Sequence, residues 1–128
     1  MTMLSDGNPF VWIEIPAADL ERARRFYGEV FDIDVQHFDA GELQFGFFPM
    51  QRGAPNGTGA LVHAPDMYTP SHDGALPYFA VTDIEAVLLR VERAGGRIFQ
   101  HRKSVGEFGF VGFFEDSEGN RIGLHSRT

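Results

Sequence analysis

Four side chains that can move protons or bind metals occupy equivalent positions in the two halves of this chain: Glu14, His63, Tyr78 and His125. A carboxylate can accept a proton, and a phenol or an imidazole can donate one to a developing oxyanion. Two imidazoles with one carboxylate are also a ligand pattern for divalent metals. We therefore treat Glu14, Tyr78, His125 and His63 as candidate catalytic residues, with Glu14, His63 and His125 as an alternative metal-binding set.

An internal repeat positions these residues. The segment Asp19–Glu21 matches Asp83–Glu85 at an offset of 64 residues, and His63 matches His125 at an offset of 62. Such self-similarity indicates a duplicated structural unit, and 128 residues is the length of one domain. We expect a single domain over residues 1–128, with a first module at about 10–64, a linker at 65–75 and a second module at about 76–126.

Each module follows the order strand, helix and three strands. In the first, a β-rich run at residues 10–15 precedes Asp19, a favoured helix N-cap, and apolar residues then recur at helical spacing. The second repeats this scheme from Tyr78–Val81, with Asp83 as the cap. The remaining strands are expected at about 34–39, 43–49 and 59–63, then at 97–102, 108–115 and 121–125. The pattern predicts an α+β fold of tandem βαβββ modules.

Strand alternation predicts which side chains share a face, because successive residues of a strand point to opposite sides of its sheet. We expect eight residues to point away from the helices: Trp12, Glu14, Leu61, His63, Leu76, Tyr78, Gly123 and His125. If the two sheets curl toward each other, this face encloses a mostly apolar cavity that suits a small molecule. The expected ligand-binding residues are Trp12, Leu61, Leu76, Gly123, Phe48 and Phe114.

Composition and charge exclude several classes of function. The net charge is −7 and the pI is about 5.1, so nucleic acid and anionic lipid surfaces are not expected partners. Cysteine is absent, which excludes disulfide scaffolds and thiol nucleophiles. The apolar runs are far shorter than the roughly 20 residues of a membrane helix, and the chain opens without a signal-peptide pattern. We expect a cytoplasmic location.

Five segments of the sequence carry a resemblance to a known family: Trp12–Pro16, Asp19–Tyr27, Gly106–Phe110, Asp116–Ile122 and Gly119–Ser126. They resemble the vicinal oxygen chelate superfamily, and within it the small bacterial proteins related to glyoxalases, bleomycin-resistance proteins and dioxygenases. The resemblance spans nearly the whole chain. It implies two curved mixed sheets with helices outside, and it implies a homodimer.

The resemblance also implies four metal-ligand positions, which fall here on Trp12, Leu61, Leu76 and Gly123. None of these side chains can coordinate a divalent cation. We therefore expect no metal cofactor at these positions. A register two residues further along each strand would instead give Glu14, His63, Tyr78 and His125, which could hold Zn, Ni or Fe.

Three functions remain open at this stage. The first is metal-independent binding or conversion of a small apolar or aromatic molecule, of which sequestration of a drug, as in bleomycin-resistance proteins, is one form. The second is a metal-dependent lyase, isomerase or dioxygenase that uses Glu14, His63 and His125. The third is an interaction module without a small ligand. The fold alone does not choose among them, because this superfold hosts many activities.

Overall fold

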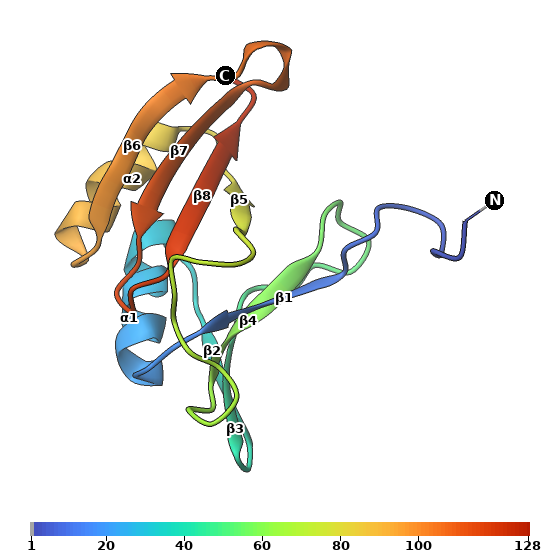
Figure 1. The fold of residues 1–128 in the computed structure, drawn as a ribbon, viewed down its shortest axis with the longest axis vertical. Helices are drawn as coiled ribbons and strands as arrows, with labels where there is room; N and C mark the ends of the chain where they lie inside the picture. Colours follow the sequence, from blue (N-terminus) through green and yellow to red (C-terminus); the bar gives the residue numbers. More distant parts are fainter. Residues whose placement is uncertain (1) are drawn as a thin grey trace.

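A computed structural model describes residues 2–128 and contains two successive β-α-β-β-β units (Figure 1). The first unit comprises β1 (Trp12–Pro16), α1 (Leu20–Phe31), β2 (Gln36–Ala40), β3 (Leu43–Phe47) and β4 (Thr58–His63). The second comprises β5 (Tyr78–Ala80), α2 (Ile84–Arg93), β6 (Arg97–Ser104), a short 3-10 turn η1 (Gly106–Phe108), β7 (Phe110–Glu115) and β8 (Arg121–Ser126). No helix within this described part of the chain is long and apolar enough to cross a membrane.

Each unit forms its own four-stranded mixed sheet. The strand order is β1-β4-β3-β2 in the first sheet and β5-β8-β7-β6 in the second. The β1–β4 and β5–β8 pairs are parallel and the other pairs are antiparallel. These two sheets with two helices confirm the expected α+β fold class, and the sheets are not closed on one another.

Local sequence explains where the two helices begin. Asp19 and Asp83 both have extended backbones, and each side chain accepts a hydrogen bond from the backbone N–H three residues later. This satisfies one of the amides that a helix leaves unpaired at its first turn. Helix α1 ends at Phe31, and Asp32 caps it with a left-handed backbone. The apolar stripe of each helix can then pack on a sheet.

Helix α1 contacts residues of both sheets. The Phe26 ring lies 6.2 Å from Phe114 on β7, and the Tyr27 ring lies 5.9 Å from Phe79 on β5. On the side of the first sheet, Tyr27 meets Phe48 at 5.4 Å. These fully or largely buried rings join the two units in one hydrophobic core.

Polar contacts reinforce the same junction. The Tyr27 hydroxyl donates to Asp116 at 2.6 Å, and the Asn120 side-chain amide donates to the Pro16 carbonyl at 2.7 Å. The Arg22 guanidinium makes a two-pronged contact with Glu118, at 2.8 and 3.0 Å. Hydrogen bonds to buried groups fix orientation as well as supplying energy. The turn between β7 and β8 is therefore anchored on α1 and on the end of β1.

This packing directs the helix-covered faces of the sheets toward the shared core and leaves their other faces open. Trp12 on the first sheet is 37 % exposed, and Tyr78 on the second is 50 % exposed. The two sheets do not curl toward each other within one chain (Figure 1), so the condition for a cavity enclosed by a single chain is not met. The physical reason is that α1 and its aromatic side chains lie between the two sheets.

Candidate ligand-binding faces

Strand register places Trp12 and Glu14 on the open face of the first sheet. Glu14 pairs with Ala60 on β4, which pairs in turn with Phe47 on β3. Paired residues point to the same side of a sheet, so Glu14 and Phe47 lie in one row with the small Ala60 side chain between them. Gly46, the neighbouring residue on β3, points to the other side of the sheet, toward Arg24 of α1. The side that carries Gly46 is therefore the helix-covered face, and the side that carries Glu14 and Phe47 is the open one.

Four aromatic side chains gather on this open face, and we refer to Trp12, Phe38, Phe45 and Phe47 as the aromatic patch. Phe47 is at its centre. Its ring stacks on Phe38 at 5.4 Å and on Phe45 at 5.5 Å, and it meets Trp12 edge-on at 5.9 Å. Phe38 is 52 % exposed. Four rings in contact on an exposed sheet face form a platform on which an apolar or aromatic body can pack.

Glu14 lies at the edge of the aromatic patch, held by two neutral donors. The Trp12 indole N–H donates to Oε2 at 3.1 Å, and the Tyr68 hydroxyl donates to Oε1 at 2.5 Å. The hydrogen bond to Glu14 raises the pKa of the Tyr68 phenol. No arginine, lysine or histidine within residues 2–128 forms an ion pair with Glu14. The carboxylate is thus oriented without having its charge neutralised.

The open face of the second sheet carries Tyr78 and His125. Tyr78 pairs with Gly123, and its ring lies directly over that residue, since a Cβ on Gly123 would come within 2.7 Å of the ring. The same ring meets Phe113 edge-on at 5.7 Å. The His125 imidazole Nε2 lies 2.5 Å from the Phe108 carbonyl oxygen. Tyr78 and His125 are therefore on the expected face, but on a different sheet from Glu14.

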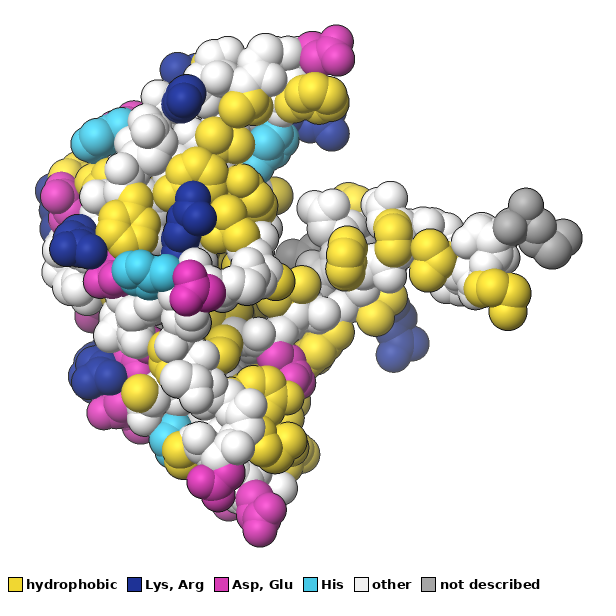
Figure 2. Space-filling view, viewed as in Figure 1, with side chains coloured by type: hydrophobic (Ala, Val, Ile, Leu, Met, Phe, Trp, Pro, Cys, Tyr) yellow, Lys and Arg dark blue, Asp and Glu magenta, His cyan; other side chains and the backbone are white. Residues whose placement is uncertain are grey.

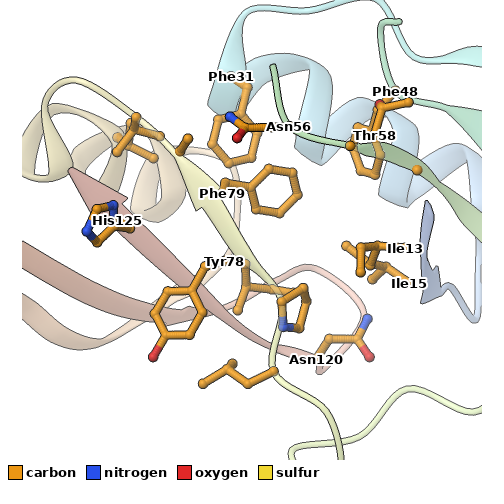
Figure 3. A pocket seen from close by; sticks show the side chains of 18 of the residues that line it. Ile13, Ile15, Phe31, Phe48, Asn56, Thr58, Tyr78, Phe79, Asn120 and His125 are labelled. Carbon is orange, nitrogen blue, oxygen red and sulfur yellow. The ribbon is translucent and has the colours of Figure 1, made fainter. Parts of the chain in front are cut away.

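A broad cleft of about 1910 Å³ separates the β1 edge of the first sheet from the β5 edge of the second. Figure 2 shows it as the hollow beside the projecting N-terminal arm. Figure 3 shows Ile13, Ile15 and Phe48 on one side of it, and Phe79, Tyr78 and His125 on the other. Leu76 also lines this cleft, immediately before β5. Trp12 and Glu14 of one open face, and Tyr78 and His125 of the other, also line this cleft, so the two open faces border a common opening.

The remaining candidate residues lie in the core or on the helix-covered face. Leu61 and Phe114 are fully buried in the core, and Phe48 is nearly so. The assignment of Leu61 and His63 to the open face is wrong. Leu61 pairs with Ile15 and Gly46 on the α1 side, and the His63 ring Nδ1 lies 2.9 Å from the Ala17 carbonyl oxygen, beside the start of α1.

A comparison with protein-family models matches residues 10–124 to the Glyoxalase/Bleomycin resistance protein/Dioxygenase superfamily. The chain belongs to this superfamily. The match runs from before β1 into β8 and so takes in both β-α-β-β-β units, which confirms the family resemblance of the sequence. Membership does not name a substrate, because activity depends on the residues that line each site.

A curated relative is the mycobacterial "Putative glyoxylase CFP32" of Mycobacterium bovis and Mycobacterium tuberculosis, 26% identical over 117 residues. The match covers 88% of this chain and 43% of that protein, so the chain spans less than half the length of this relative. Its name describes that longer protein.

Solved structures agree on the fold. A glyoxylase/bleomycin resistance protein/dioxygenase domain from Frankia sp. EAN1pec superposes with a TM-score of 0.73 at 16% identity, covering 94% of this chain and 98% of that one. TnmS3, an antibiotic binding protein from Streptomyces sp. CB03234, has a TM-score of 0.66 at 23% identity and covers 100% of both chains. At these identities the likeness is one of fold.

Within one chain, neither set of candidate ligands fits a divalent metal ion. The positions expected for ligands, Trp12, Leu61, Leu76 and Gly123, have no side-chain atom that coordinates a divalent cation. The alternative set is divided, with Glu14 and His125 on separate sheets and His63 on the helix-covered face. Across residues 2–128, no three His, Cys, Asp or Glu side chains gather in a way that could hold a metal ion.

Sequence reasoning missed two contributors to this site. Tyr68 lies in the linker, where no periodic pattern indicates that its hydroxyl returns to Glu14. Phe38 could have been found, because it pairs with Phe45 on the neighbouring antiparallel strand. Alternating Phe residues on one strand and a Phe at the facing position of the next indicate one aromatic surface.

Proposed function

We propose that this protein binds a small apolar or aromatic molecule on the aromatic patch, without a metal ion. The observation that carries this proposal is the ring cluster centred on Phe47, exposed on the sheet face opposite α1. Exposed aromatic clusters of this kind serve as binding sites, because burying them gains free energy in proportion to the apolar area removed from water. Glu14 supplies a polar group that fixes the orientation of the bound molecule.

Binding without metal is supported by the chemistry of the residues present. An indole, two leucines and a glycine occupy the four positions where the family resemblance implies ligands. TnmS3, which is named an antibiotic binding protein and has the same fold over its whole length, supports binding as the activity.

We further propose that two copies complete the site. β1 and β5 each have an unpaired edge, and both edges border the cleft. Exposed apolar side chains accompany them, with Phe10 at 77 %, Val11 at 76 % and Tyr78 at 50 %. Unpaired, apolar strand edges favour association with another chain. In such a dimer, Tyr78 and His125 of one copy would cover the aromatic patch of its partner.

The binding proposal is tested by the fluorescence of Trp12, the single tryptophan of the chain. Phenylbutanol, a neutral probe with a single aromatic ring, is expected to give a saturable change that persists in EDTA. Phe47→Ala should weaken binding about tenfold, as the loss of one aromatic contact implies. Leu89→Ala, which removes an exposed apolar side chain on α2, should leave binding unchanged.

Absence of a saturable change with phenylbutanol would contradict the binding proposal. Loss of binding in EDTA, restored by added Zn²⁺, would contradict metal independence. Equal effects of Phe47→Ala and Leu89→Ala would place the bound molecule outside the aromatic patch.

A further inference from the structure

We infer that the molecule bound on the aromatic patch is an organic cation, with an apolar or aromatic body and an ammonium group that lies against Glu14. This inference rests on the proposed function and specifies the chemical class of its ligand. Three observations lead to it. The charge of Glu14 is not neutralised, the Trp12 indole is oriented toward Glu14, and arginines lie over aromatic rings on the second sheet but not on the aromatic patch.

The first observation concerns charge. A carboxylate can accept about four hydrogen bonds, and each oxygen of Glu14 accepts one from a neutral group. Neutral donors leave the full negative charge in place. Glu14 is half-buried beside apolar rings, where water screens that charge less than at a fully exposed surface. A ligand ammonium would supply both the missing hydrogen-bond donors and the missing counter-charge.

The second observation concerns the rings next to Glu14. The hydrogen bond from the Trp12 indole holds that ring beside the carboxylate, and Phe47 meets it edge-on. Because the indole donates through its N–H edge, an ammonium that binds Glu14 lies at the rim of the aromatic patch. The ring faces of the patch are then left for the apolar or aromatic body of the ligand.

The third observation is a contrast between the two sheets. On the second sheet, three aromatic rings already hold a cation from the chain itself: Arg97 over Phe99 at 5.1 Å, Arg102 over Phe110 at 3.5 Å and Arg121 over Phe113 at 5.2 Å. Its carboxylate Glu115 also has a cationic partner in Arg97, at 3.8 Å. On the aromatic patch, by contrast, neither Glu14 nor any ring has a cationic partner from residues 2–128.

The experiment compares two probes of matched shape, phenylbutylamine and phenylbutanol, by titration at neutral pH with Trp12 fluorescence and calorimetry as readouts. The amine is protonated there, because alkylamines titrate near pH ~10. We expect the amine to bind about tenfold more tightly than the alcohol, the size of one charge-assisted hydrogen bond at a half-buried carboxylate.

Two variants assign the effect to one carboxylate. Glu14→Gln keeps the shape and an acceptor oxygen but removes the charge, so the tenfold preference should disappear while the affinity for phenylbutanol is retained. Glu42→Gln changes net charge equally at an exposed position beyond the end of β2, and it should retain the preference. This pair separates a local interaction from general attraction to an acidic protein.

Each outcome has a distinct meaning. Equal affinities for the two probes in the unmodified protein would overturn the cation inference and leave the binding proposal standing. Failure of both probes to bind would count against the proposed function itself. A preference for the amine that survives Glu14→Gln, or that Glu42→Gln also removes, would overturn the assignment to Glu14.

Discussion

The Tyr27 hydroxyl donates a 2.6 Å hydrogen bond to Oδ2 of Asp116, which joins α1 to a turn 89 residues later in the sequence. Both side chains are buried, with Tyr27 fully enclosed and Asp116 at 3 % exposure. Burial raises the pKa of the Tyr27 phenol well above its usual value. The phenol therefore stays protonated and remains a donor to Asp116.

Removal of this hydroxyl should destabilise the whole chain. Tyr27→Phe leaves Asp116 with one donor fewer in a buried environment, and we expect the free energy of unfolding to fall by about 1–3 kcal/mol. Tyr78→Phe is the matched control, because the Tyr78 ring is half-exposed, and a change of less than about 0.5 kcal/mol is expected there. Urea unfolding monitored by circular dichroism measures both. A Tyr27→Phe protein as stable as the control would contradict this account.

The contact between Arg22 and Glu118 should make stability depend on pH. Burial raises the pKa of Glu118, but hydrogen bonds from the Arg22 side chain and the Asp19 backbone outweigh it, and the pKa lies below the usual 4.5. The ionised form is thus favoured by folding. Its contribution is present above about pH 4.5 and is lost as the pH falls through the lowered pKa of the folded state.

Glu118→Gln should remove this dependence. The stability difference between the unmodified protein and the variant should shrink as the pH is lowered from about 6 to 3. Asp116 acts in the opposite direction, because burial raises its pKa above the usual 3.8. Asp116 is present in both proteins, so its effect largely cancels in the difference. Urea unfolding at several pH values measures the stability difference between the two proteins. A difference that stays constant with pH would contradict the prediction.

Two glycines in sheets should differ sharply in their tolerance of alanine. A Cβ on Gly59 would collide with the carbonyl oxygen of Ile13 on the paired strand β1, and backbone cannot move aside without separating the strands. We expect Gly59→Ala to cost about 1–3 kcal/mol. The three atoms nearest to a Cβ on Gly123 all belong to the Tyr78 ring, which is half-exposed and can turn away. Denaturant unfolding of both variants should give the larger loss at Gly59, and the reverse order would contradict this reasoning.

The proposed association of two copies makes a prediction about mass in solution. Light scattering after size-exclusion chromatography should give twice the 14.3 kDa of one chain. Val11→Lys places a charge beside the unpaired edge of β1 and should shift the protein toward monomer, since charged side chains block edge pairing. Leu89→Lys introduces the same charge at a half-exposed position on α2 and should not. A monomeric mass for the unmodified protein at micromolar concentrations would contradict the association.

The order of helices and strands could be predicted from the sequence, because each signal is local. Asp19 and Asp83 cap the helices as expected, and every expected strand is present with its ends shifted by a few residues at most. The face of β4 could not be predicted. Ala60, Leu61 and Val62 are all apolar and all fully buried, so alternation carries no information there and the neighbouring strands decide the register.

The candidate site could be predicted only in part, for a related reason. Alternation placed Trp12, Glu14, Tyr78 and His125 on the open faces, as their pairings agree. How the two sheets sit relative to each other depends on side chains of α1 that pack against both of them. These contacts join apolar core residues that look alike in sequence. Their spacing along the chain does not indicate which of the two sheets each α1 side chain packs against.

The sharing of α1 by both sheets has a consequence for synthesis on the ribosome. The helix is complete once Phe31 has been added, but Phe26 packs against Phe114 and Tyr27 bonds to Asp116. Part of the apolar surface of the first unit therefore has nothing to pack against until about eighty further residues have been synthesised. During that interval the exposed rings of α1 are available to chaperones or to other nascent chains.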